Sequence, residues 1–282
     1  MNSLQWISDN GYYICAGGKG PLILSGRVDT NVSGQAQEVK APLQNGISSY
    51  DPTLEEMEIS FGITLQISGT RNVRAKAMRD EWKNIVSFAF APNCYGTLIY
   101  NTETGENYAR CRPTSKPVVK EHQSGLVEWE IELVSDYPMW QGAEQSAYMG
   151  MLEKKLIYPV VLPTVYGEYK PGVTIDNAAL VEVFPVYEVY SNLETFGVTN
   201  ETTGKEFSIN HAIDDDEKMV IDTYHKTVTL IHADGTAEDI SHYLDGDFVT
   251  LCGGLNRLVA HNQIVSENPS CKIMWRLPKM EA

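Results

Sequence analysis

Residues 57–67 read MEISFGITLQI, and apolar and polar residues alternate along the whole stretch. Alternation with period two is typical of a strand that buries one face and exposes the other. Residues 127–133, VEWEIEL, repeat the pattern with Glu128, Glu130 and Glu132 on the polar face. Because parallel strands are usually buried on both faces, these stretches predict an antiparallel sheet.

One helix is predicted between these strands, at 71–88, RNVRAKAMRDEWKNIVSF. Its apolar residues recur at three- to five-residue steps opposite Arg and Lys, which predicts a core-facing side. That side comprises Val73, Ala77, Met78, Trp82, Ile85 and Val86. Residues 98–111, LIYNTETGENYARC, then predict a hairpin with Gly105 in its turn.

The second half of the chain has a different spacing of predicted strands and turns. The alternating strand stops at Pro138 and a less patterned stretch, 142–155, follows, so we place a domain boundary near residue 140. Strands and turns then come about every 8–12 residues with no long helix, which predicts a sandwich or jelly roll. The predicted strand segments are 156–166, 181–190, 196–210, 219–231, 247–260 and 271–278.

The composition is that of a globular chain, with 43% apolar and 21% charged residues and a net charge of −15. Residues 141–282 carry −11 of that charge. A surface this acidic repels phosphate backbones, so no sequence-specific nucleic-acid partner is expected. The N-terminus has no signal-peptide pattern, and no apolar run reaches the ~18 residues that span a bilayer. We therefore expect no membrane partner and synthesis in a cytoplasm.

The acidic run Asp214–Glu217, followed by Asp222 and His225, is the most enzyme-like constellation. An EF-hand loop spaces its ligands and has a glycine at position six, whereas this run places its acids side by side. His211 and His232 flank the region, so a loose surface metal site is one reading. The other is a solvated connection before a strand–turn–strand, in which Asp222 accepts backbone N–H bonds as an Asx-turn residue.

The other chemical patterns favour structural interpretations. A glycosidase needs two shielded carboxylates, but the three glutamates of 127–133 lie evenly along a solvated face. The glycine-rich stretches 15–22 and 252–256 lack the following helix of a phosphate-binding loop and predict turns, the second a hairpin turn with Gly253 and Gly254 at positive φ. Five distant cysteines without a C-x-x-C pair predict free thiols. No catalytic residue, cofactor or metal is predicted, and we do not expect an enzyme.

An ordered series of strand and turn motifs runs through 135–282. It consists of SDYPMW (135–140), TIDNAALVEVFPVYEVY (174–190), VTNETTGKEFSI (198–209), KMVIDTYHKTVTL (218–230), TLCGGLNRLV (250–259) and CKIMWRL (271–277). The series resembles the distal tail proteins of long-tailed, non-contractile bacteriophages and their equivalents in phage-tail-like bacteriocins. Its characteristic residues are Pro138, Asn177, Asn200, Gly204, Asp222, Gly254 and Asn256. One departure is that Ala178 and Ala179 follow Asn177, where a glycine turn is usual in that family.

The resemblance implies a mainly β protein of two domains. Residues 1–140 would form a ring-building β-sandwich with one helix and a long hairpin, and residues 141–282 a galectin-like β-sandwich. The implied role is a structural virion protein at the tail tip, assembled in the host cytoplasm. A hexameric ring of it would join the tail tube protein to a tail-associated lysin or to receptor-binding or baseplate proteins. No catalytic residue comes with the family.

Two alternative functions follow from the same sequence. A galectin-like domain could be a carbohydrate-binding module that aids attachment to host cell-wall glycan, although fold alone does not confer binding. The second half has no distinctive cluster of Trp and polar residues to support this alternative. A glycan hydrolase that uses the acidic residues is the third hypothesis.

Overall fold

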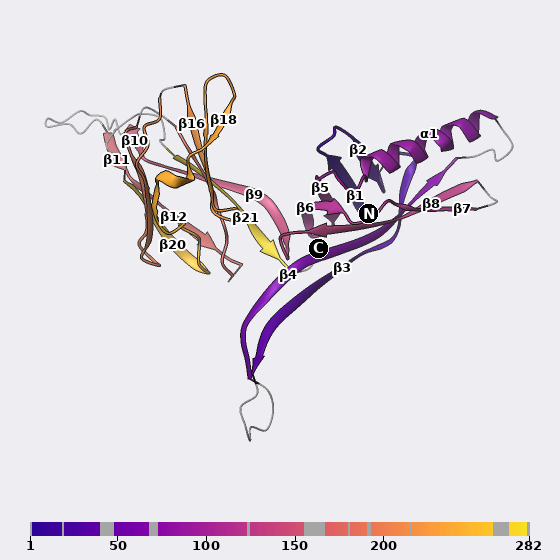
Figure 1. Ribbon diagram of the computed structural model, residues 1–282, viewed down its shortest axis with the longest axis horizontal. Coiled ribbons are helices and arrows are strands. Elements are labelled where there is room, and N and C mark those ends of the chain that lie inside the picture. Colours follow the sequence, from indigo (N-terminus) through magenta and orange to yellow (C-terminus); the bar gives the residue numbers. More distant parts are fainter. Residues whose placement is uncertain are drawn as a thin grey trace, which may run out of the picture. The chain divides into compact units, whose positions relative to one another are not determined.

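The computed structural model describes residues 2–18, 20–39, 48–67, 73–122, 125–154, 167–179, 181–190, 193–214, 216–261 and 271–280. Its contacts divide the chain into two units (Figure 1). Unit 1 comprises Met1–Ala143 with Lys279–Ala282, and unit 2 comprises Glu144–Pro278. Antiparallel strands dominate both units, which confirms the predicted mainly β class.

Unit 1 contains two sheets that share one strand. The first has the order β2 (Tyr13–Ala16), β1 (Ser3–Ser8), β5 (Gly96–Thr102) and β6 (Gly105–Pro113). The second has the order β3 (Leu22–Val39), β4 (Ser48–Gln66), β8 (Leu126–Ser135) and β7 (Val118–Glu121). The strand β6 joins them because its last residues, Arg112 and Pro113, pair with β8.

The two alternating stretches lie side by side in the second sheet. Residues Met57 to Gln66 of β4 pair antiparallel with Ser135 to Leu126 of β8. Every second residue is buried, and these residues form one core with Trp6 of the first sheet and with Trp140, the first residue of β9 (Trp140–Met149). The prediction of a one-faced antiparallel sheet is confirmed. The predicted hairpin is also present as β5 and β6, with Gly105 at a φ of 124°.

The strands β3 and β4 are much longer than the pattern indicated, at 18 and 19 residues. The pairing of β4 with β8 stops at Met57, whereas β3 and β4 stay paired as far as Val39 and Ser48. Residues 33–39 of β3 and 48–56 of β4 form a two-stranded outer arm that projects from the rest of unit 1 (Figure 1). Residues 48–56 do not alternate and include Pro52, so the period-two pattern could not reveal them.

The predicted helix is α1 (Val73–Ala89), but its predicted core-facing side is only partly correct. Val86 is buried and Trp82 and Ile85 pack against the core. Val73 and Met78 instead are 85% and 42% exposed. The helix packs on the short strand β2, and its last residue, Ala89, accepts a 2.8 Å hydrogen bond from the indole of Trp6. In its first turns Ala75 is buried, whereas Val73, Ala77 and Met78 are exposed.

Unit 2 is a sandwich, as predicted. One sheet has the order β18 (Ala237–Asp239), β17 (Thr227–Ile231), β16 (Lys218–Asp222), β13 (Val186–Val189), β21 (Cys271–Lys279) and β9 (Trp140–Met149). The other has the order β12 (Gly172–Asn177), β20 (Gly254–His261), β14 (Phe196–Asn200), β15 (Lys205–Ile209) and β19 (Leu244–Gly246). Both sheets contribute to one core, where Tyr187 contacts Phe207 with a 5.6 Å centroid distance.

The remaining elements of unit 2 are short. They are the paired strands β10 (Met151–Lys154) and β11 (Gly167–Lys170) and the single-turn 3₁₀ helix η1 (Ser241–Tyr243). The less patterned stretch 142–155 lies largely in β9 and β10. The middle of β9 is exposed at consecutive positions, which removes the alternation that marks a strand. The strand predicted at 156–166 lies outside the described residues.

Candidate functional site

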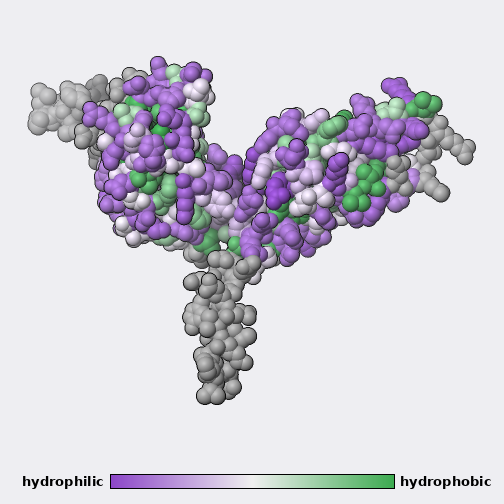
Figure 2. Space-filling view, viewed as in Figure 1, coloured by the Kyte–Doolittle hydropathy of each residue, from purple (hydrophilic) through white to green (hydrophobic). Residues whose placement is uncertain are grey.

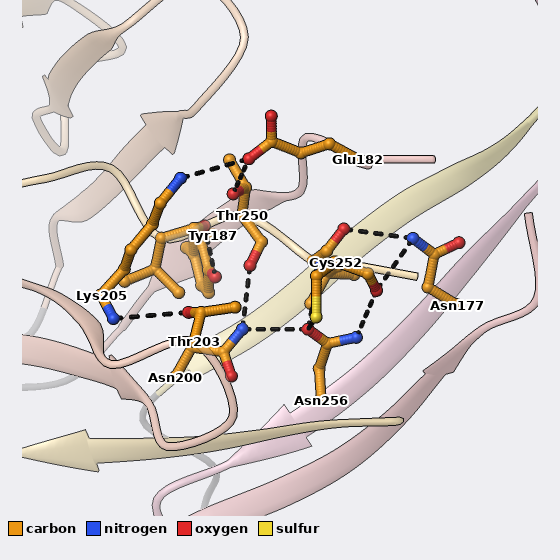
Figure 3. A network of polar contacts seen from close by, with 11 residues as sticks. Asn177, Glu182, Tyr187, Asn200, Thr203, Lys205, Thr250, Cys252 and Asn256 are labelled. Atoms are coloured by element: carbon orange, nitrogen blue, oxygen red, sulfur yellow. Dashed lines mark hydrogen bonds and ion pairs between the residues drawn. The ribbon is translucent and has the colours of Figure 1, made fainter. Parts of the chain in front are cut away.

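Three of the motif residues meet in the interior of unit 2 (Figure 3). Asn177 ends β12, Asn200 ends β14 and Asn256 lies in β20, and all three are fully buried. The Asn200 Nδ2 donates to the Asn256 Oδ1 over 3.0 Å. A buried amide without partners would destabilise the fold, so three such side chains must have an extensive set of acceptors and donors.

Those partners are backbone groups of the segment 250–254, which precedes and enters β20. The Asn177 Nδ2 lies 3.1 and 3.2 Å from the carbonyl oxygens of Leu251 and Cys252. The Asn200 Nδ2 donates to the Thr250 carbonyl over 3.0 Å. Asn256 accepts from the Cys252 N–H at 2.9 Å and donates to the Cys252 oxygen at 2.7 Å. The asparagines thus supply hydrogen bonds that a regular ladder does not supply to this partly buried segment.

The same asparagines also close two turns. The Asn177 Oδ1 accepts from the Ala179 N–H at 3.1 Å, so the turn forms without the usual glycine. The Asn200 Oδ1 accepts from the Thr202 N–H at 3.0 Å, and Gly204, with a φ of 73°, completes the turn between β14 and β15. Pro138, the first of the seven motif residues along the chain, lies in the bend between β8 and β9.

The glycine stretch 252–256 only partly follows the prediction. Gly254 has a φ of 88°, as expected, whereas Gly253 is not among the described glycines with positive φ. The stretch is not a hairpin turn, because β19 pairs with β15 while β20 pairs with β12 and β14. Which strands would become neighbours was not readable from the local glycine pattern.

Asp222 belongs to a separate turn, between β16 and β17. These strands pair from Lys218 and Ile231 to Asp222 and Thr227, which confirms the predicted strand–turn–strand. The Asp222 Oδ1 accepts the N–H groups of Tyr224 and His225 at 2.9 and 3.0 Å. Its Oδ2 lies 2.8 Å from the His225 Nδ1. Asp222 is therefore the Asx-turn residue that the sequence predicted.

The acidic run before β16 is not entirely solvated. Asp214 and Asp216 are exposed, as expected, but the Glu217 Oε1 lies 2.6 Å from the Nδ1 of His232. The other ring nitrogen of His232 lies 3.3 Å from Glu238 on β18. The hydrogen bond to Glu217 raises the pKa of His232, and the same bond lowers the pKa of Glu217. His232 thus connects the β17–β18 turn to the start of β16.

The glutamates of β8 and the cysteines, which the sequence offered as possible catalytic or metal-binding groups, are not arranged as such a site in the described residues. The Glu130 carboxylate is 2.7 Å from the Lys120 ammonium of β7, and Glu128 is 3.2 Å from His122. The five cysteines, all within the described ranges, are free thiols, as predicted. In the described part of the chain, no group of three His, Cys, Asp or Glu side chains has a metal-site arrangement. No helix among those residues is long and apolar enough to cross a bilayer.

Unit 1 presents surfaces suited to association. Val73, Met78 and Phe88 of α1 are exposed, and so are Val118 and Val119 of β7. Figure 2 shows apolar side chains on the surface of unit 1 in the region of these two elements. Among the described strands, β3 and β7 each pair with only one neighbour, so each leaves one edge open. Open edges and exposed apolar side chains are typical of surfaces that bind other chains.

Comparison with known proteins gives a result at the level of structure. No protein-family model matches the chain, and no curated protein matches its sequence. Twelve chains of solved structures match it. One is the Dit protein (gp 19.1) of phage SPP1, described as a paradigm of the hub adsorption apparatus in phages that infect Gram-positive bacteria. It has a TM-score of 0.60 and 11% identity over 98% of this chain and 99% of that chain.

The chain has the fold of a phage tail hub protein. A chain of the phage P2 baseplate in its activated conformation with Ca matches with a TM-score of 0.59 and 12% identity, over 100% of both chains. The P2 baseplate with Sr gives 0.57 and 13% identity, over 97% of this chain and 98% of that chain. The matches extend through both units, so the resemblance to distal tail proteins inferred from the motifs is confirmed for the fold.

Proposed function

We propose that the protein is a structural component of a phage tail tip, where copies of it form a hexameric ring. The ring would join the tail tube protein to a tail-associated lysin or to receptor-binding or baseplate proteins. The observation that carries this proposal is the fold match over nearly the full chain to a hub protein and to baseplate chains. In this proposal the protein acts in the assembled virion, by binding rather than by catalysis, and needs no cofactor.

The surfaces of unit 1 support ring formation. A closed ring of identical chains needs a heterologous interface, in which one patch contacts a different patch of the next copy. The first turns of α1, with Val73 and Met78, provide one apolar patch, and the exposed valines of β7 provide another. The open edges of β3 and β7 add backbone hydrogen-bonding groups that a neighbouring copy would satisfy.

Native mass spectrometry and negative-stain electron microscopy of the full chain test the proposal. We expect particles of six copies with a central opening. The double variant Val73→Glu and Met78→Glu should shift the protein to monomers, because a closed apolar interface does not tolerate unpaired charges. Leu255→Glu is the matched control, since Leu255 is 65% exposed but lies on unit 2. A chain that stays monomeric at every concentration, also when mixed with tail components, would contradict the proposal.

A further inference from the structure

A polar hollow lies on the outer face of the five-stranded sheet of unit 2. Its volume is about 400 Å³, within the ~300–1,000 Å³ range of small-molecule sites. The residues that matter for its chemistry are Gly197, Thr199, Glu206, Ser208, Asp245 and His261. They come from β14, β15, β19 and β20, so the sheet itself positions them.

Gly197 forms the floor of this hollow. It lies in β14, the central strand, opposite Ser208 on one side and His261 on the other. Its φ is outside the positive region that favours glycine, so the backbone conformation does not call for one. A Cβ there would lie 3.0 Å from the Phe207 oxygen and 3.5 Å from the Ser208 Cβ. Glycine weakens a strand interior and often marks close approach by a ligand or another backbone.

The side chains around Gly197 are pre-arranged by hydrogen bonds. The Thr199 Oγ1 lies 2.7 Å from the Nε2 of His261 and 3.3 Å from the Oε2 of Glu206. Asp245 extends the row, because it is the strand partner of Ser208. The hollow therefore combines hydroxyl groups, an imidazole and two carboxylates on one rigid surface, an arrangement that suits a ligand with several hydroxyl groups.

The charge of the lining limits the ligand class. It contains two carboxylates and no Lys or Arg. Phosphorylated or otherwise anionic ligands would be repelled, whereas the hydroxyl groups of a neutral ligand would donate to the carboxylates.

We propose that this hollow is a binding site for a neutral saccharide unit. The site goes beyond the assembly role and does not depend on it, because all of its residues belong to unit 2. The cluster that sequence inspection did not find is formed by two pairs of strands, within 196–209 and 244–261, that are separated along the chain. Its recognition would rest on the hydroxyl and carboxylate groups of Thr199, Glu206 and Asp245.

The test is a titration of the full chain with soluble probes, in which binding is measured by NMR or calorimetry. The probes are soluble neutral oligosaccharides of hexoses and of N-acetylhexosamines, with poly(glycerol phosphate) as the anionic probe. Thr199→Val keeps the side-chain shape and removes the hydroxyl. Thr174→Val is the matched control, because Thr174 is exposed in β12 of the same sheet but does not line the hollow. Gly197→Ala fills the floor.

We expect saturable binding of at least one neutral probe. Thr199→Val and Gly197→Ala should weaken it by roughly tenfold or more, since a polar site that loses a buried partner loses about that much affinity. Thr174→Val should leave it unchanged. No saturable binding of any neutral probe up to about 10 mM, an equal loss in Thr174→Val, or preferred binding of poly(glycerol phosphate) would overturn the proposal. Ring formation is measured on the same samples, so failure of the hub proposal is recognised separately.

Discussion

The amide nitrogen of Asn200 donates to the amide oxygen of Asn256 over 3.0 Å, and neither residue has any solvent-exposed surface. The pair joins the end of β14 to the middle of the neighbouring β20. Around it, Asn177 and Asn256 hold the backbone of 250–254. Each of these asparagines satisfies backbone groups that a hydrophobic side chain would leave without a partner.

We therefore expect Asn256→Ala to destabilise unit 2 strongly. It would leave the Cys252 N–H without its partner, while the Asn200 amide would keep the Thr250 oxygen and the Cys252 oxygen would keep the Asn177 amide. At about 1–3 kcal/mol for an unsatisfied group, with a smaller loss from the two weakened ones, the free energy of unfolding should fall by roughly 2–3 kcal/mol. Urea denaturation measures the change. Asn210→Ala is the control, an exposed asparagine of the same unit, and should stay within about 0.5 kcal/mol of the wild type. Equal effects of both variants would contradict this role of the network.

A second prediction concerns the turn between β16 and β17. Asp222→Ala removes the acceptor of two backbone N–H groups and should cost about 1–2 kcal/mol of stability. Asp222→Asn retains the Oδ1 acceptor and should cost less. His225→Ala loses the contacts of a largely exposed imidazole with Asp222 and Tyr224 and should have a small effect. Thermal unfolding of the three variants checks this order, and a larger loss in His225→Ala would refute it.

The His232–Glu217 pair should make the stability of unit 2 depend on pH. Because the hydrogen bond to Glu217 raises the pKa of His232 above 6.5, its contribution is full below pH 6.5 and is lost as the pH rises through the folded pKa. Because the pKa of Glu217 is lowered from 4.5, its contribution is full above pH 4.5 and is lost as the pH falls through the folded value. The pair should therefore stabilise most between these values.

The measurement is the urea midpoint of unfolding between about pH 4 and 8, in the wild type and in His232→Gln. The wild type should lose stability above neutral pH relative to the variant. An NMR titration of the imidazole gives the pKa directly. Parallel curves for the two proteins, or an imidazole pKa below that of a free histidine, would show that the pair has no such effect.

A fourth prediction separates folding from assembly in unit 1. Replacing Gly34–Leu54 by Asn-Gly removes the outer arm, and the remaining ends, Ser33 and Glu55, already form a 2.8 Å hydrogen bond. The side chain of Leu54, at the end of the removed part, is 49% exposed, and we expect the melting temperature to change little. A two-stranded ribbon is marginal in water, so we expect the arm to be stabilised by neighbouring copies. Native mass spectrometry should find the shortened protein monomeric; an intact ring would contradict the prediction.

The strands of this protein were the most predictable elements. The residues of 57–67 and 127–133 alternate because each strand has one buried face, and this information is contained in a few consecutive residues. The same holds for the Asx turn at Asp222, whose acceptor and donors lie within three residues. The residue pattern did not reveal the outer arm, because residues 48–56 have no apolar alternation, and only the family resemblance implied a long hairpin.

The motif residues, in contrast, could be named but not explained from the sequence. Asn177, Asn200 and Asn256 come together only because β12, β20 and β14 are neighbours in one sheet. The hollow above Gly197 likewise depends on the neighbours of β14. Local periodicity by itself determined the strands with one buried face and the turn at Asp222. Tertiary structure decided the buried network and the candidate binding surfaces, because both depend on contacts between residues far apart in the chain.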